Sequence, residues 1–178
     1  MEDEIQLLLQ DKAKHRQAFD KIVKVYSERL YWHVRRMVHS HDDADDVLQN
    51  TYIKVWRNIA SYRGDSKLYT WLYRIATNEA LNHIRQQKRL YKVGDDVDTE
   101  NQASLSGDAY FDGEAAEAKL HLAIQGLPDK QRAVFNLKYF EEMKYEEMSE
   151  VLETSVGALK ASYHHAVQKV KYYLENNE

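Results

Sequence analysis

The sequence has no cysteine, one proline and six glycines in 178 residues. Without cysteine there is neither a disulfide framework nor a thiolate metal site. Sparse proline and glycine favour helices, because strand-rich proteins need frequent turn residues. No apolar run approaches the length of a membrane span, and the N-terminal MEDEIQLLLQDKAKH is too short in its apolar part for a signal peptide. We therefore expect an all-α protein that stays in the cytoplasm.

Motifs that would indicate an enzyme are missing as well. The sequence has no glycine-rich phosphate loop, no nucleophile elbow and no HExxH pattern. His33, His39 and His41 lie beside two aspartates, but their spacing fits no common set of metal ligands. We predict no catalytic residue, no metal, no cofactor and no small-molecule substrate.

Charge is segregated along the chain despite a net charge of only −4. Residues 51–92 hold nine Lys or Arg against Asp65 and Glu79, whereas residues 93–118 hold eight Asp or Glu and no Lys or Arg. Residues 93–113 also lose apolar periodicity, which is typical of a linker that cannot bury a core. The sequence thus predicts two small helical domains, residues 1–92 and 115–178, joined by an acidic flexible linker at 93–114.

Apolar spacing predicts the helices of both domains. In the first domain we expect helices at residues 18–37 and 41–59, the second capped by Asp42, then a turn at 63–66 and a long helix to residue 89. In the second domain we expect helices at 115–125, with Gly126 just past its end, at 128–139 and at 145–152. Ser155 should cap a last helix that reaches about residue 174.

Cations and aromatic rings share one face of residues 61–89. At 100° per residue they form a stripe, while an apolar ridge on the same helix would pack against neighbouring helices. Cations neutralise phosphate and flat rings stack on unpaired bases, so the stripe predicts a nucleic-acid interface. The alternative is an exposed helix whose cations only aid solubility. The stripe consists of Lys67, Trp71, Arg74, Asn78, Arg85 and Arg89, and the ridge of Leu68, Leu72, Ala76, Ala80 and Ile84, with Ile75 close by.

The last two helices have the spacing of a helix-turn-helix, with the turn at residues 153–155. Val156, Leu159, Tyr163, Ala166 and Val170 should face the core. Ala158, Ala161, Ser162, His165 and Gln168 should point outward and are the candidate reading face.

These features together resemble the extracytoplasmic-function (ECF) group of bacterial RNA polymerase sigma factors. DDADDVLQNTYIKVWRN is similar to the family's polymerase-binding segment, and TWLYRIATNEALNHIR to its promoter-opening segment. Residues 127–170 are similar to the domain that reads the upstream promoter element. The resemblance implies a sigma factor that binds core RNA polymerase through the β′ clamp helices and the β flap, and promoter DNA. Runner-up hypotheses are a stand-alone helix-turn-helix regulator and a helical interaction module without a nucleic-acid role.

The resemblance also assigns roles to residues. Polymerase contacts would be Asp45, Asp46, Gln49 and Asn50, although relatives commonly carry Glu at the position of Asn50, and dipole complementation could by itself explain the acidic helix start. Contacts to the minus-ten element would be Tyr62, Arg63, Asp65, Lys67, Trp71, Arg74, Asn78, Arg85, Lys88 and Arg89, although Trp71 could instead belong to the core. Contacts to the minus-thirty-five element would be Ser155, Ala158, Lys160, Ala161, Ser162, His165 and Lys169.

The chain departs from the family in the helix-turn-helix. It has Glu153 where relatives usually have Gly, and Ser162, His165 and Val167 where they often have Arg. Weak independent DNA affinity is therefore expected from this domain. Family members are often held inactive by a membrane-associated anti-sigma protein, which a flexible linker would permit here. Asp95, Asp96, Asp98 and Glu100 in the linker could imitate a transcript or simply solvate a tether.

Overall fold

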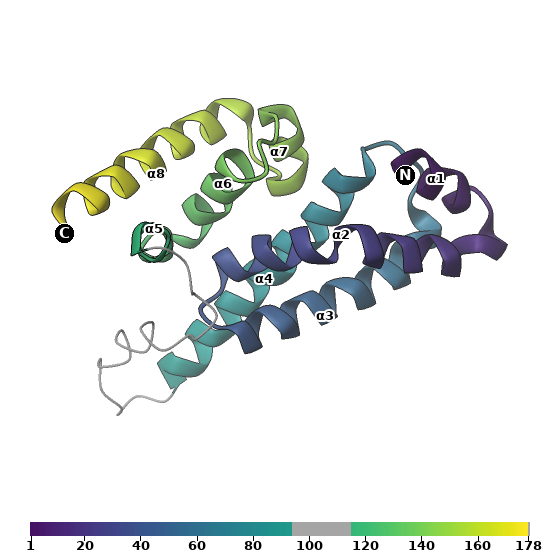
Figure 1. Ribbon diagram of the computed structural model, residues 1–178, viewed down its shortest axis with the longest axis horizontal. Coiled ribbons are helices and arrows are strands. Elements are labelled where there is room, and N and C mark those ends of the chain that lie inside the picture. Colours follow the sequence, from purple (N-terminus) through teal and green to yellow (C-terminus); the bar gives the residue numbers. More distant parts are fainter. Residues whose placement is uncertain (94–114, 178) are drawn as a thin grey trace.

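The computed structural model describes residues 1–93 and 115–177, and all regular elements in these ranges are helical (Figure 1). No helix in these ranges combines the length and the apolar character that a membrane span needs. The linker and its four candidate transcript-like carboxylates lie outside the described residues. The helices are α1 (Glu2–Leu9), α2 (His15–Met37), α3 (His41–Asn58), α4 (Leu68–Val93), α5 (Ala115–Gln125), α6 (Asp129–Tyr139), α7 (Tyr145–Leu152) and α8 (Val156–Asn176), with 3-10 turns at Lys12–Lys14 and Ile59–Ser61.

The first domain consists of α2, α3 and α4, which pack side by side, and of α1, which crosses the start of α2 (Figure 1). The sequence pattern does not predict helix α1, because eight residues without a side-chain cap are marginal as an isolated helix. Tertiary contacts hold it in place. Ile5 and Leu9 are buried against α2, and the Tyr26 hydroxyl donates a hydrogen bond of 3.0 Å to Glu2.

Helix α3 begins as predicted at His41, but Asp42 is not its cap. The Ser40 hydroxyl accepts a hydrogen bond of 3.1 Å from the Asp43 backbone N–H, while Asp42 is exposed in the first turn. Ser40 has the extended backbone that a capping residue needs, whereas Asp42 is already helical. The acidic side chains of the first turn still complement the helix dipole.

The second domain contains α5 to α8, and α7 and α8 form the predicted helix-turn-helix. The Ser155 hydroxyl caps α8 by accepting from the Ala158 N–H at 3.3 Å. Glu153, in the turn, is left-handed with φ 50° and ψ 44°, a conformation that favours glycine and costs other residues about 1 kcal/mol. Gly126, by contrast, has no positive φ and continues the helical hydrogen bonding of α5 through its N–H to Leu122 at 3.1 Å.

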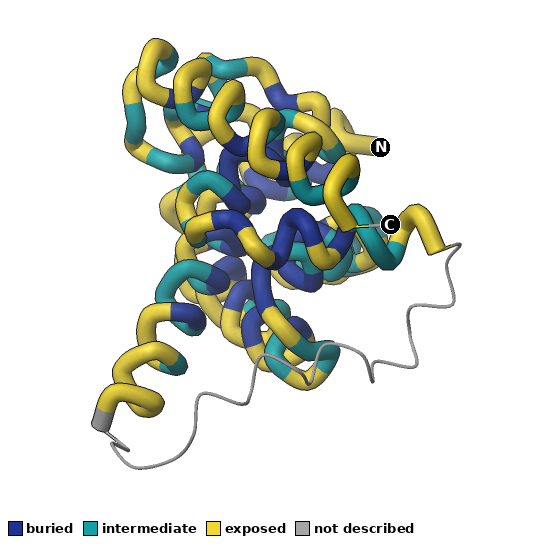
Figure 2. The backbone as a smooth tube through the Cα atoms, turned by 90° about the vertical axis from the view of Figure 1, so that its left-hand side faces the viewer, coloured by how far each residue is buried: buried dark blue, intermediate teal, exposed yellow. Residues whose placement is uncertain are grey.

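The two domains pack against each other and share one buried apolar cluster, while the second domain keeps a further buried cluster of its own. Helix α7 lies on α4, and α6 contacts α2 and α4 (Figure 1). Met148 and Val151 of α7 and Leu137 of α6 belong to the same buried cluster as Leu72 of α4. Buried segments accordingly gather in the middle of the molecule, with exposed segments around them (Figure 2). The helix faces that would carry function are therefore fixed relative to one another.

Candidate polymerase and nucleic-acid interfaces

Helix α4 separates its two predicted faces as expected. Leu68, Leu72, Ala76, Ala80 and Ile84 are all buried in the core. On the opposite stripe the polar members are exposed and Trp71 is half-buried, so Trp71 belongs partly to each side. The exposed members are Lys67, Arg74, Asn78, Arg85 and Arg89, and Lys88 is exposed beside them.

The loop before α4 (residues 61–67), here called the pre-α4 loop, is closed by its own contacts. The Tyr62 hydroxyl donates to the Ser66 carbonyl at 2.7 Å, and Gly64 supplies the left-handed turn with φ 79°. The Tyr62 ring lies against Trp71, with ring centroids 5.1 Å apart. Arg63 and Asp65 are exposed at the tip. The loop and the first turn of α4 together present two packed aromatic rings beside charged and polar groups, which is a surface suited to unpaired bases.

Part of the stripe faces the second domain. Lys67 pairs with Glu147 at 2.8 Å, Lys88 pairs with Asp129 at 2.5 Å, and Arg74 pairs with Glu153. Arg85 stays within its own helix and donates to Asn82 at 2.7 Å. The sequence pattern predicts the exposed face of α4 but not these partners, because they lie on a different domain.

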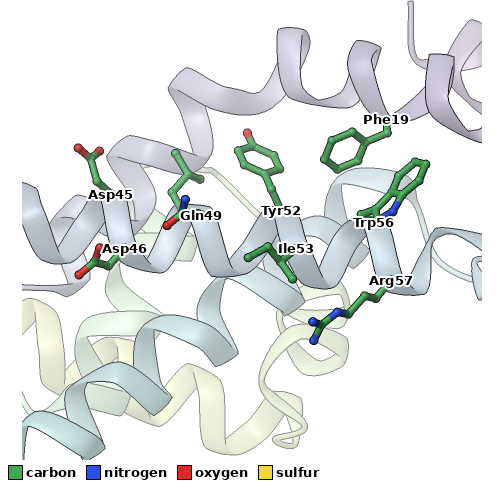
Figure 3. A pocket seen from close by; sticks show the side chains of 9 residues that line it. Phe19, Asp45, Asp46, Gln49, Tyr52, Ile53, Trp56 and Arg57 are labelled. Carbon is green, nitrogen blue, oxygen red and sulfur yellow. The ribbon is translucent and has the colours of Figure 1, made fainter.

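A groove of about 900 Å³ lies on the outer face of α3, with mostly apolar side chains along its middle (Figure 3). Asp45, Asp46 and Gln49 occupy one end, and Trp56 and Arg57 the other, with Tyr52 and Ile53 between them (Figure 3). Phe19 of α2 forms part of the wall and packs edge-on against Trp56, with centroids 5.3 Å apart. Asn50 is exposed but does not line the groove.

The groove combines charge with exposed apolar area. Ile53 is 43% exposed and Trp56 is 47% exposed, although both are large and apolar. Such a patch on a folded domain is typical of a protein interface, where aromatic anchors contribute most of the affinity. The sequence motif identifies the acidic and amide residues but not Phe19, Tyr52, Ile53 and Trp56. A signal is nevertheless present, because Tyr52, Ile53 and Trp56 form an apolar row outside the buried row of Val47, Thr51 and Val55.

The outer face of α8 lies as predicted and carries little charge. Ser155, Ala158, Lys160, Ala161, His165 and Lys169 are exposed, and Ser162 is half-buried. Leu159, Ala166 and Val170 are buried, whereas Val156 and Tyr163 are only half-buried. Lys169 donates to Gln131 at 3.1 Å, and the Lys160 ammonium lies 5.6 Å from the centre of the Tyr145 ring. The predicted minus-thirty-five contacts thus include two lysines and no arginine, so this face offers few cations for phosphate.

Comparison with known proteins agrees with this architecture. The sigma-70 region 2 profile matches residues 22–90, and the sigma-70 region 4 profile matches residues 117–170. The chain is 33% identical to the RNA polymerase sigma-H factor of Pseudomonas aeruginosa, over 98% of this chain and 95% of that protein. It is 32% identical to the ECF RNA polymerase sigma factor SigW of Bacillus subtilis, over 94% of each. The fold is similar to that of the sigma factor RpoE in its co-crystal structure with the anti-sigma factor NepR from Bartonella quintana, with TM-score 0.76, 22% identity and coverage of 90% of this chain and 98% of that one.

A helical protein that carries sigma-70 regions 2 and 4 in this order is an RNA polymerase sigma factor, whose partners are core polymerase and promoter DNA. Its relatives match over nearly their whole length, and the chain belongs to the ECF group. Its function is to direct transcription initiation. The comparisons favour this function over the two alternatives, a stand-alone regulator and an interaction module.

Proposed function

We propose that this sigma factor docks on core RNA polymerase through the groove on α3 and captures the unpaired minus-ten strand with the stripe on α4. The groove supports docking because its acidic end can pair with basic groups while its aromatic rings bury apolar area. The stripe supports strand capture because its cations lie beside Trp71, whose ring packs against Tyr62 of the preceding loop, and both rings can stack on bases. The protein supplies binding energy for promoter opening and no chemistry of its own.

The second domain makes the other contacts of the proposal. We assign to it the contacts with the β flap of the polymerase and with the minus-thirty-five element, and the outer face of α8 is the face toward DNA. Its low charge makes the upstream contact dependent on tethering to the polymerase, which raises the effective concentration of the domain at the promoter. A sigma factor acts where core polymerase is, so we assign this chain to the cytoplasm. An anti-sigma partner, as in the co-crystal structure of RpoE with NepR, is part of the same proposal.

The observation that carries the proposal is the exposed apolar groove beside Asp45, Asp46 and Gln49, on the same domain as the cationic stripe. The most direct test is transcription in vitro with purified core polymerase on fragmented genomic DNA of the host, followed by mapping of the transcript starts. We expect starts that require this chain and share one pair of upstream elements. Starts that do not depend on the chain would contradict the proposal.

The docking surface is tested by competition for core polymerase with a second sigma factor. We expect the double substitution Asp46→Ala with Gln49→Ala, and separately Trp56→Ala, to weaken core binding by roughly 10-fold or more, because hot-spot residues carry most of an interface's energy. Asp42→Ala and Tyr172→Ala are matched controls, since both side chains are exposed outside the groove. Equal effects of variants and controls would remove the groove from the polymerase interface.

A further inference from the structure

A line of polar contacts connects helix α2 to the acidic start of α3. Tyr31 of α2 and His41, the first residue of α3, lie together, with the Tyr31 hydroxyl 2.6 Å from His41 Nδ1 and the two ring centroids 5.7 Å apart. The other ring nitrogen, Nε2, lies 3.2 Å from a carboxylate oxygen of Asp45, one turn further along α3. These three residues are here called the His41 cluster.

The first turn of α3 is a fixed platform for this cluster. Ser40 caps the helix, and its hydroxyl also donates to the Asp43 carboxylate at 2.8 Å. The other oxygen of Asp43 lies 2.8 Å from Nε2 of His83 on α4. The start of α3 is thus tied to both of its neighbouring helices. On this turn a spacing of four residues places His41 and Asp45 on one face of the helix.

The position of the ring proton follows from the groups on either side of His41. A carboxylate has only acceptor oxygens, so the approach to Asp45 is attractive when Nε2 carries the proton. In the neutral ring Nδ1 is then an acceptor, and the Tyr31 hydroxyl donates to it. Tyr31 thereby selects the tautomer in which His41 presents a donor to Asp45, because the bond at one ring nitrogen fixes the role of the other.

Asp45 lines the acidic end of the α3 groove, so its orientation decides where one negative charge of the docking surface lies. Its side chain is 56% exposed and that of His41 is 33% exposed. A pair exposed to this degree contributes little to stability. Its effect is on conformation, because it restricts a carboxylate that could otherwise rotate in solvent, and a side chain already restricted loses less entropy on binding.

The neighbouring groove carboxylate, Asp46, is in a different situation. Asp45 and Asp46 point in different directions from α3 (Figure 3). Within the part of the chain that the structure describes, Asp46 has no hydrogen bond or ion pair. The two carboxylates at this end of the groove therefore differ in freedom, although the sequence places them side by side.

We infer that His41 is a positioning residue of the polymerase interface: held by the Tyr31 hydroxyl, its ring fixes the Asp45 carboxylate at the acidic end of the groove before the polymerase is bound. The inference rests on the proposed role of the groove in docking. It adds to the interface two residues, Tyr31 and His41, that do not line the groove. Asp45 is the carboxylate set in advance, and Asp46 is the one that adjusts to its partner.

The test is a double-mutant cycle in the competition assay for core polymerase. We expect His41→Ala and Asp45→Ala each to weaken binding by roughly 3-fold or more, the scale of one polar interaction. The double variant should bind no more weakly than Asp45→Ala alone, because His41 acts through Asp45. In an Asp46→Ala background the His41→Ala effect should persist in full. His39→Ala is the matched control, since His39 is exposed and does not line the groove. Independent effects of His41→Ala and Asp45→Ala, or equal binding by His41→Ala and the control, would overturn the inference.

Conservative variants distinguish positioning from a purely structural role of the ring. His41→Gln should keep most of the affinity, because the Gln amide nitrogen extends about as far as Nε2 and can face Asp45. His41→Asn extends only to the place of Nδ1 and should bind as weakly as His41→Ala. Tyr31→Phe keeps the aromatic ring without its hydroxyl and should weaken core binding only where Asp45 is present. Equal binding by the Gln and Asn variants would refute the positioning role.

A measurement without polymerase separates this inference from the proposed function. Long-range ¹H–¹⁵N NMR spectra at about pH 8.5, where free imidazole is neutral, should show the His41 proton on Nε2, and Tyr31→Phe should weaken this preference. A proton on Nδ1 would overturn the inference whatever the polymerase assay gives. If Trp56→Ala weakens core binding while His41→Ala and Asp45→Ala do not, the inference is wrong and the docking groove stands. If none of the three variants weakens it, the groove itself is rejected as the docking surface.

Discussion

At the scale of single residues, His33 shows how burial sets chemistry in the first domain. Its side chain has no exposed surface, and one ring nitrogen lies 2.9 Å from the Thr77 hydroxyl. Burial, and then the nearby charge of Arg36, lower the pKa of His33 to about 3. His33 is thus a neutral histidine of the core that joins α2 to α4 through the Thr77 hydroxyl.

This pKa predicts acid sensitivity. The unfolded chain binds a proton at His33 below about pH 6.5, and the folded chain does so only near pH 3, so the unfolded state binds more protons between these values. The free energy of unfolding should therefore fall as the pH drops through this window, by up to about 1.4 kcal/mol per pH unit from this group. Urea titrations at several pH values should show a shallower fall for His33→Gln. His164→Gln, at an exposed position, should keep the wild-type slope, and a wild-type slope in both variants would contradict the assignment.

At the scale of elements, the buried and exposed faces of α4 can be predicted from the sequence more fully than those of α3. The ridge of α4 can be predicted because Leu, Ala and Ile recur at helical spacing with no competing apolar row. On α3 the apolar residues occupy two rows, and sequence alone does not tell which row the neighbouring helices cover. The structure places Val47 and Val55 inside and Ile53 and Trp56 outside, so only half of the groove is predictable. Helix α1 is not predictable because its stability comes from α2 and not from its own residues.

The far end of α4 allows the strand-binding role to be tested apart from the second domain. Arg85 and Arg89 are exposed, and in the described structure neither has an ion pair with the second domain. Replacing both with Ala should reduce the salt slope of single-stranded DNA binding by about 1.4, because each phosphate that is no longer neutralised removes about 0.7. Fluorescence anisotropy across a series of salt concentrations measures this slope. Lys24→Ala on α2 is the control, and a slope that matches this control would exclude these two arginines from the strand path.

At the scale of the whole molecule, the domains share a core although the sequence divides them. The acidic, aperiodic stretch at 93–114 rightly indicates two helical units, because local composition decides whether a segment can bury a core. It holds no information on how the units meet. Contacts such as Arg132 to Met37 and Tyr73 to Glu141 join residues far apart in the chain, and no local pattern encodes them. The placement of the α4 stripe relative to the second domain is therefore seen only in the three-dimensional structure.

The shared core predicts that the domains unfold together. All three tryptophans, Trp32, Trp56 and Trp71, lie in the first domain, whereas helix content reports on both. Urea unfolding followed by tryptophan fluorescence and by far-ultraviolet circular dichroism should give coincident transitions, because each domain loses buried area when the other unfolds. A midpoint from circular dichroism that differs clearly from the fluorescence midpoint would show that the interface is too weak to couple them.

The two bonds of Glu147 have a consequence for reversibility. Its carboxylate accepts from the Lys144 N–H at 3.2 Å and so completes the start of α7, while it also accepts from Lys67 of the first domain. When Lys67 moves away, the backbone partner remains, so the helix keeps its own terminus intact. Loss of this ion pair is therefore reversible, because the first turn of α7 stays ordered without Lys67 and the carboxylate remains in position to pair with it again.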